Sequence, residues 1–246
     1  MNISHPDKNS EVYKQFIDLI NQKVANAITW LAERNIDYIW NYQINGHLYR
    51  LYIPCKDLLL DFEYYPVNDY EYNYIRVNYD TDIEILLEKL FPKNIYNTED
   101  LTVWKLSQRY CNRFLKENNR PAVYGKDILR LAWVDKDKNI YQCIVIKDDK
   151  IIANVTKRNC SVLYGTYMML RYLTEMFGFD EILIKESTEN SYTNTIYRLI
   201  NAEVIKETNK IKIWWSPKGT KWKIEKEQTS QFIPFYFCEN RIYKYK

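Results

Sequence analysis

The stretch HLYRLYIPCKDLLLDFEYY, residues 47–65, constrains the fold more than any other part of the chain. Residues 49–53 and 58–62 are rich in β-branched, aromatic and leucine side chains, and residues 54–57 between them are turn formers. This pattern predicts two adjacent antiparallel strands. Side chains alternate across a strand, so Asp61 and Glu63 share one face, where two carboxylates can converge on one cation.

The composition is that of a folded globular protein. The chain has 246 residues, of which 46% are hydrophobic and 27% charged, and its 5 glycines form no flexible linker. No apolar run reaches the roughly 18 residues that a membrane span needs, and the first residues lack a signal-peptide core. The abundance of Asn, Ile, Lys and Tyr suits an AT-rich genome, such as that of many phages. We therefore expect a cytoplasmic protein, in a phage-infected bacterial host, without a membrane partner.

Cysteine usage points to the same compartment. The five cysteines are scattered, with no CxxC pair and only two histidines to accompany them. A disulfide framework or a zinc site is therefore not expected. We expect free thiols in a reducing compartment.

Charge is distributed unevenly along the chain. The net charge is +3, yet residues 210–246 hold nine Lys or Arg against three Glu. This segment interleaves lysines, which neutralise phosphates, with tryptophans, which stack on bases, a combination typical of a nucleic-acid surface. The alternative is a hairpin at a sheet edge, with tryptophans in the core and lysines protecting the edge. The predicted nucleic-acid-binding residues are Lys210, Lys212, Trp214, Trp215, Lys218, Lys221, Trp222 and Lys223.

Hydrophobic periodicity predicts an α+β fold. In the first part, we expect a helical segment at 10–34, strands at 36–44, 48–53, 58–61 and 74–78, and a helix at 82–90. Residues 91–97, which contain Pro92, are the best candidate for a domain boundary. Beyond it, we expect a helix at 98–118, strands at 128–134, 141–147 and 150–156, a helix at 163–177, a strand at 181–185, a helix at 193–200 and a terminal hairpin of 204–206 with 210–215.

The segment YRLYIPCKDLLLDFEYY resembles the "YDFYIP…LLIEFDG" strands of phage homing-type endonucleases. In that family, a very-short-patch-repair-like PD-(D/E)xK nuclease domain is joined to an acetyltransferase-like (GNAT-like) domain. The later segment NSYTNTIYRLINAEVIKETNKIKIWW resembles part of the second domain and its closing hairpin. The resemblance implies a small PD-(D/E)xK-like domain over residues 1–92 and a GNAT-like antiparallel α/β domain over residues 93–246, with a basic, aromatic C-terminal hairpin.

The resemblance also implies a metal site. In such nucleases, acidic side chains hold Mg²⁺, which orients water and stabilises the phosphate in the transition state. Asp61 falls at the family's glutamate and Glu63 at its aspartate, so both are implied as catalytic residues and Mg²⁺ ligands. A further acid of the family falls at Arg50, which would repel a metal. The implied active site is therefore degenerate.

A cofactor site in the GNAT-like domain is less well supported. In that fold, the N-terminus of a helix binds the pyrophosphate of coenzyme A, and the preceding loop needs glycine for close approach. Here the loop reads RNCSVLYGTYMM, with Gly165 as its sole glycine and Leu163 where another would fall. Tyr197 falls where a general acid could lie, although a core position is the plainer interpretation. We expect no cofactor other than Mg²⁺.

Three functions follow, in this order. The first is a phage DNA-binding protein of homing-endonuclease descent, with compromised Mg²⁺-dependent cleavage of double-stranded DNA. The second is a non-enzymatic nuclease-fold protein that regulates transcription or inhibits a host protein by binding it. The third is a GNAT acetyltransferase.

Overall fold

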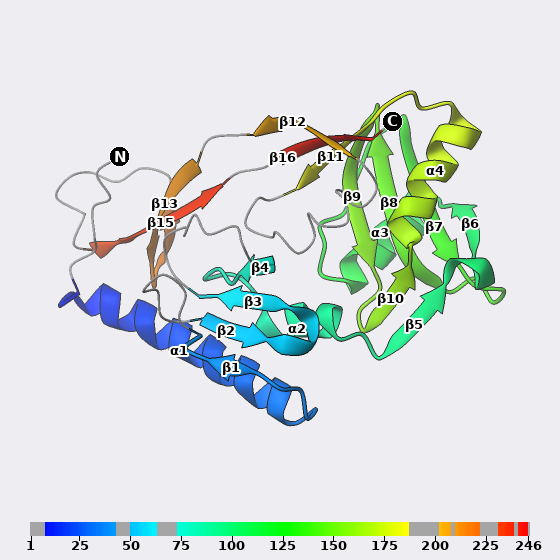
Figure 1. Ribbon diagram of the computed structural model, residues 1–246. Helices are drawn as coiled ribbons and strands as arrows, with labels where there is room; N and C mark the ends of the chain where they lie inside the picture. Colours follow the sequence, from blue (N-terminus) through cyan, green and yellow to red (C-terminus); the bar gives the residue numbers. More distant parts are fainter. Residues whose placement is uncertain are drawn as a thin grey trace. The chain divides into compact units, whose positions relative to one another are not determined.

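The computed structural model describes residues 8–42, 50–62, 73–186, 202–207, 210–221, 231–238 and 241–245 (Figure 1). The chain divides into two compact units, and each is built from separate stretches of sequence. The first unit contains Met1–Glu84, Ser187–Thr195 and Thr208–Asn240, and the second contains Ile85–Glu186, Ile196–Glu207 and Arg241–Lys246. The sequence suggests a single boundary near residue 92, whereas the chain passes several times from one unit to the other.

The first unit opens with helix α1, Glu11–Ala32, which confirms the helix predicted at 10–34. Ser10 caps it, because its Oγ accepts a hydrogen bond of 3.1 Å from the backbone N–H of Tyr13. One face of α1 is apolar at helical spacing and is buried against its own unit. The buried residues are Phe16, Ile20, Val24, Ala27, Trp30 and Leu31.

A four-stranded sheet follows α1 in the first unit. Its strands, in spatial order, are β1 (Ile39–Trp40), β2 (Arg50–Ile53), β3 (Leu58–Asp61) and β4 (Asn73–Arg76). The β2–β3 hairpin is the one that the sequence predicts; its turn is a short 3-10 helix that ends at Asp57 in the left-handed conformation. β4 joins β3 in parallel. The predicted turn at Asn45 and Gly46 lies outside the described residues.

A second, three-stranded antiparallel sheet belongs to the first unit. Its order is β14 (Gly219–Lys221), β13 (Lys210–Ser216) and β15 (Ile233–Cys238). The expected hairpin of 204–206 with 210–215 is therefore wrong: β13 pairs with β14 and β15, while β12 (Glu203–Glu207) pairs with β16 (Arg241–Tyr245) in the second unit. β12 and β13 follow one another in sequence but lie in different sheets, because each pairs with strands further along the chain.

The second unit is built on a seven-stranded mixed sheet. Its order is β12-β16-β11-β9-β8-β7-β6, where β6 is Thr102–Lys105, β7 Ile128–Val134, β8 Ile140–Lys147, β9 Lys150–Thr156 and β11 Ile182–Glu186. The predicted strands at 128–156 and at 181–185 are thus confirmed. All neighbouring pairs are antiparallel except β9 and β11. The mixed α+β class is as predicted.

Two helices cover opposite faces of this sheet (Figure 1). Alternation along the strands sends Trp133 and Ile144 into one cluster with α4, Gly165–Phe177, and Cys143 into another with α3, Gln108–Glu117. Each fully buried aliphatic or aromatic side chain contributes roughly 1.5–3 kcal/mol to folding. The two apolar clusters therefore hold the helix, sheet and helix layers together.

The segment between α2 (Ile83–Leu90) and α3 differs from expectation. A helix is predicted over 98–118, but β6 occupies its first half, and the helix begins only after Ser107, whose Oγ accepts from the N–H of Tyr110. The β-branched and aromatic side chains of the TVWK stretch pair with β7 instead. Before it, β5 (Asn94–Asn97) pairs in parallel with β10 (Cys160–Leu163).

The predicted helix at 193–200 lies outside the described residues. Among the helices that the structure does describe, none has the length and apolar character needed to cross a membrane.

Candidate functional site

The structure buries the first of the two predicted metal ligands. Asp61 ends β3 and is only 5% exposed. Its backbone partners in register are Arg50 on β2 and Arg76 on β4, so both neighbouring strands carry a basic residue at this level. Glu63 lies outside the described residues. Within the described ranges, no group of three or more His, Cys, Asp or Glu side chains is placed to hold a metal ion.

The predicted nucleic-acid-binding residues fall on β13, β14 and the segment after them. Trp215 is buried, and its ring meets that of Phe16 edge-on with 5.1 Å between centroids, so it packs inside the first unit. Trp214 is half-buried, and Lys218 and Lys221 are exposed. Only the backbone of Lys210 and Lys212 is described, and Trp222 and Lys223 lie outside the described residues. Binding of double-stranded DNA stays a prediction, as does binding of a host protein.

The second unit offers a different feature, an opening between the parallel strands β9 and β11. Their register consists of Leu183 with Lys150 and Ile184 with Ile151. β11 continues to Glu186 in register with β16, and β9 continues to Thr156 in register with β8. The two strands are therefore paired only where each begins, and the edge of β9 beyond Ile151 is not paired with β11.

A β-bulge marks the point where this pairing ends. Along β8, Val145 faces Ala153 and the next residue, Ile146, faces Ile151, which leaves Ile152 of β9 as the extra residue. Its side chain is 44% exposed. Because a bulge bends a strand and increases its twist, it turns the remainder of β9 away from a regular parallel pairing.

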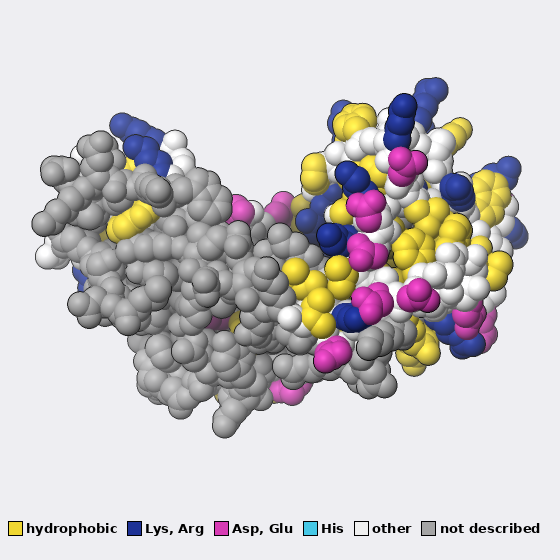
Figure 2. All heavy atoms as spheres, turned by 90° about the horizontal axis from the view of Figure 1, so that it is seen from above, with side chains coloured by type: hydrophobic (Ala, Val, Ile, Leu, Met, Phe, Trp, Pro, Cys, Tyr) yellow, Lys and Arg dark blue, Asp and Glu magenta, His cyan; other side chains and the backbone are white. Residues whose placement is uncertain are grey.

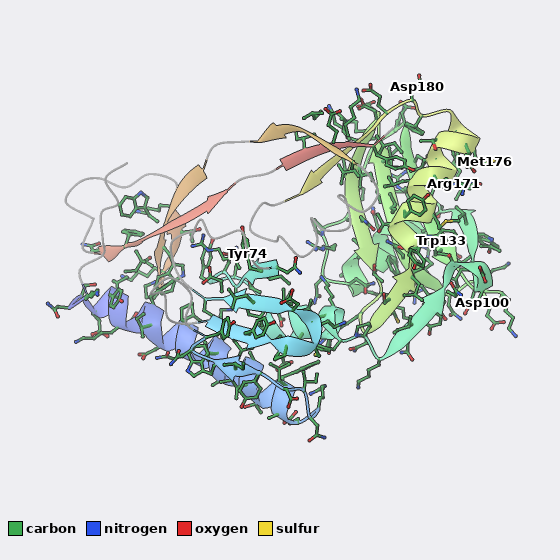
Figure 3. All side chains as sticks on the ribbon, viewed as in Figure 1. Tyr74, Asp100, Trp133, Arg171, Met176 and Asp180 are labelled. Atoms are coloured by element: carbon green, nitrogen blue, oxygen red, sulfur yellow. The ribbon has the colours of Figure 1, made fainter. Side chains whose placement is uncertain are left out.

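The buried Gln142 and the half-buried Asn154 and Thr166 tie the start of α4 to the sheet beside this opening. The Nε2 of Gln142 donates to Asn154 Oδ1 and to Thr166 Oγ1, each at 2.9 Å, and Asn154 Nδ2 donates to the same hydroxyl at 3.1 Å. From β7, the indole N–H of Trp133 donates to the carbonyl of Gly165 at 2.9 Å (Figure 3). These bonds fix the first turn of α4 over β8 and β9.

Gly165 is required at this position for packing. A Cβ there would lie 2.2 Å from Gln142 Oε1 and 2.7 Å from Val162 Cγ1, well inside contact distance. The residue before it, Tyr164, is 75% exposed, adopts a left-handed conformation with φ of 55° and makes no side-chain capping bond. The N-terminus of α4 thus presents its backbone dipole without a side-chain cap.

Tyr141 and Asp135 form a second polar cluster, near the turn between β7 and β8. The hydroxyl of Tyr141 donates to Asp135 Oδ2 at 2.9 Å, and the Tyr96 ring lies 3.9 Å away between centroids. Burial, together with hydrogen bonds to Tyr96 and Asp135, raises the pKa of Tyr141 well above its ordinary value. This tyrosine therefore stays protonated at neutral pH and is a poor proton donor. Tyr197 lies outside the described residues.

Charge on the visible face of the second unit is mixed. Figure 2 shows basic and acidic side chains interspersed there, with apolar side chains between them. Such a surface lacks the single-sign field that favours nonspecific binding to nucleic acid.

Sequence reasoning missed the groups that shape this opening. Gln142 could have been found from the sequence, because it is the lone amide inside the apolar strand YQCIVI. A buried amide needs hydrogen-bond partners, so its position indicates a polar contact inside the core. The bulge at Ile152 leaves no comparable mark in the sequence.

Comparisons with known proteins found similarity among solved structures. No family model matches the chain, and no curated protein does. Among solved structures, it is similar to a dodecameric spermidine N-acetyltransferase from Vibrio cholerae, with 12% identity, a TM-score of 0.40 and coverage of 59% of this chain and 93% of the other. It is also similar to an IAA acetyltransferase from Bacillus cereus, with 11% identity, a TM-score of 0.38 and coverage of 59% and 98%. At these values the similarity assigns no activity to the chain.

These findings correct one half of the family resemblance. The similar structures are acetyltransferases, in agreement with the GNAT-like part, and nothing found supports the PD-(D/E)xK or homing-endonuclease part. The expectation of a Mg²⁺-dependent DNA endonuclease is therefore wrong. Asp61 is buried, and the buried Arg76 stands in register with it on β4, where a cation opposes metal binding.

Proposed function

We propose that the second unit binds an acyl thioester of coenzyme A in the opening between β9 and β11 and transfers the acyl group to an amine. The observation that carries this proposal is the edge of β9 beyond Ile151, which is free of β11 because of the bulge at Ile152. An exposed strand edge binds extended chains through main-chain hydrogen bonds. The pantetheine arm of coenzyme A is such a chain, because it is extended and carries amide groups.

The position of the opening supports the same ligand. It lies at the carboxyl ends of two adjacent parallel strands, where open sheets commonly bind ligands. The N-terminus of α4 is attached to β9 there through Asn154 and Thr166. Backbone N–H groups at a helix N-terminus are suited to the phosphates of coenzyme A.

The residues fit the pantetheine arm better than they fit the phosphates. The loop before α4 has a single glycine, and Gly165 is already packed against Gln142 and Val162. Tyr164, rather than glycine, stands where the backbone would approach a phosphate. We therefore expect coenzyme A to bind weakly, chiefly through its arm.

Isothermal titration of the full chain with coenzyme A and acetyl-coenzyme A tests this site. Ile152→Trp should fill the opening and abolish binding. Ile95→Trp is the matched control, because Ile95 is also an exposed isoleucine of the second unit but lies on β5. Lack of binding by the wild-type chain, or an equal loss in both variants, would count against the proposal.

Activity needs a separate measurement. The wild-type chain, incubated with acetyl-coenzyme A and a polyamine or a lysine peptide, should produce an acetylated amine detectable by mass spectrometry. Binding without any acetylated product across a panel of amines would reduce the proposal to a coenzyme A-binding unit.

A further inference from the structure

Two cysteines touch inside the second unit, on the face of the sheet away from α4. Cys111 on α3 and Cys143 on β8 place their Sγ atoms 3.7 Å apart, within hydrogen-bonding range for thiols. Both side chains are fully buried, among apolar neighbours such as Phe114 and Val145. The two thiols come from residues 32 positions apart, so their contact joins a helix to the sheet beneath it.

A buried cation lies close to this pair. Arg130 on β7 is 7% exposed and donates to the carbonyl of Ile128 at 2.9 Å and to Gln108 Oε1 at 3.3 Å. None of the ion pairs formed between described residues includes it, and its Nε has no hydrogen-bond partner among them. No carboxylate in the described part of the chain therefore neutralises its charge, and this charge favours a negative charge on a neighbouring group.

The pair is chemically asymmetric. The hydrogen bond with Cys143, together with the charge of Arg130, lowers the pKa of Cys111, although burial opposes this. The hydrogen bond with Cys111, and burial, raise the pKa of Cys143. Cys111 is the thiol of the pair whose pKa is lowered, and the thiolate is the nucleophilic form.

We propose that Cys111 and Cys143 form a reversible disulfide that locks α3 to the sheet under oxidation by a peroxide. The Cys111 thiolate attacks one oxygen of hydrogen peroxide, forms a sulfenic acid, and releases hydroxide, which takes up a proton to give water. The Cys143 sulfur, on losing its proton, then attacks the Cys111 sulfur and expels the second hydroxide, which that proton converts to water. Two thiols are oxidised by two electrons and one peroxide is reduced to two waters.

The geometry singles out this pair among the cysteines with described side chains. Cys160 is buried in the cluster on the opposite face of the sheet, and Cys55 is exposed in the first unit. A disulfide needs a sulfur–sulfur distance of about 2 Å, so α3 must move toward β8 by less than the width of an atom. Reduction by a small thiol restores the starting state.

Peroxide treatment of the full chain, followed by nonreducing peptide mapping, tests the lock. We expect a linked peptide that joins Cys111 to Cys143 and lacks two hydrogens, and that disappears on treatment with dithiothreitol. Cys55→Ser is the control and should leave the link intact, whereas Cys111→Ser should abolish it. Oxidation should also raise the unfolding temperature of the wild-type chain and leave that of Cys143→Ser unchanged.

The peptide map of the wild-type chain decides the question even where a serine variant does not fold. Sulfinic or sulfonic acid at Cys111 without a link, or a link to Cys160, would overturn the proposal. So would a link that forms without any rise in the unfolding temperature, because a lock between helix and sheet must stabilise the unit.

Discussion

Gln142 occupies the volume that a side chain on Gly165 would need. Its amide bonds both Asn154 and Thr166, so one buried residue sets the distance between β8, β9 and the first turn of α4. At this position the absence of a Cβ matters for space, because Gly165 does not have the positive φ that usually selects glycine.

Replacement of this glycine should be costly. We expect Gly165→Ala to reduce the free energy of unfolding by about 1–3 kcal/mol, since an added methyl group forces neighbours out of a packed site. Urea denaturation of the full chain measures the loss. In a Val162→Ala background, the added methyl group has more room on one side, and the further loss should be smaller. An equal loss in both backgrounds would show that crowding is not the cause.

Asp135 organises the turn between β7 and β8. Its carboxylate accepts from the side chain of Asn139 at 2.9 Å and from Tyr141, and the hydrogen bond from Asn139 is the main reason that its pKa lies below the ordinary value. A lowered pKa means that the folded state prefers the carboxylate. The stabilisation is therefore complete above the ordinary pKa near 4 and is lost as the pH falls through the lower, folded-state pKa.

Asp135→Asn should thus be less stable than wild type at pH 7, and the difference should shrink at about pH 3. Urea midpoints at the two pH values measure this. Asp137→Asn is the control, because Asp137 contributes its backbone N–H to the turn. A difference between wild type and Asp135→Asn that does not change with pH would contradict the assignment.

At the scale of elements, the sequence pattern predicts a strand or helix correctly where residues close in sequence determine the structure. The β2–β3 hairpin and the three strands of 128–156 are confirmed, because alternation and turn residues both lie within a few positions. It fails at β6, where the pattern predicts a helix but pairing with β7 makes TVWK a strand. It fails again at β12 and β13, whose strand partners lie further along the chain. Tertiary pairing overrides propensity in such segments.

Helix α3 is short and mostly exposed, so its cap should matter. Ser107→Ala removes the side-chain acceptor for the N–H of Tyr110 and should destabilise the second unit by about 0.5–2 kcal/mol. Hydrogen exchange should report faster exchange in α3. Ser10→Ala removes the matching cap of α1 in the first unit, and it should leave exchange in α3 unchanged. Faster exchange in both helices from either variant would indicate a global effect.

At the scale of the whole molecule, the two units share one interleaved chain. After β12, the chain forms β13, β14 and β15 of the first unit and then returns as β16, which lies between β11 and β12 of the second. This order explains why a single boundary near residue 92 does not describe the units. A boundary read from Pro and loop residues assumes that each unit is continuous in sequence.

A chain that ends at Asn240 tests the interleaving. It lacks only β16 and the residue after it, yet the loss leaves β11 without its antiparallel partner and β12 without a neighbour in the sheet. We expect the second unit to become sensitive to limited proteolysis, whereas a chain lacking Lys246 alone should resist it like the wild type. Equal resistance of both truncated chains would show that β16 is dispensable.

The candidate site was predictable only in part. Asp61 and Glu63 were selected by a motif. The predicted hairpin already places Arg50 at the level of Asp61, but the register of Arg76 involves a parallel strand that no local pattern reveals. The opening beside β9 depends on a bulge and on strands separated by a helix, so it too is a property of the assembled sheet.

The place of β16 in the sheet also has a consequence for synthesis on the ribosome. β11 and β12 are made well before residues 241–245, and the intervening segment of 208–240 belongs to the other unit. Until β16 emerges, β11 exposes an unpaired edge, which is the kind of surface that aggregates or recruits chaperones. Slow insertion of β16 should therefore expose the new chain to aggregation during synthesis.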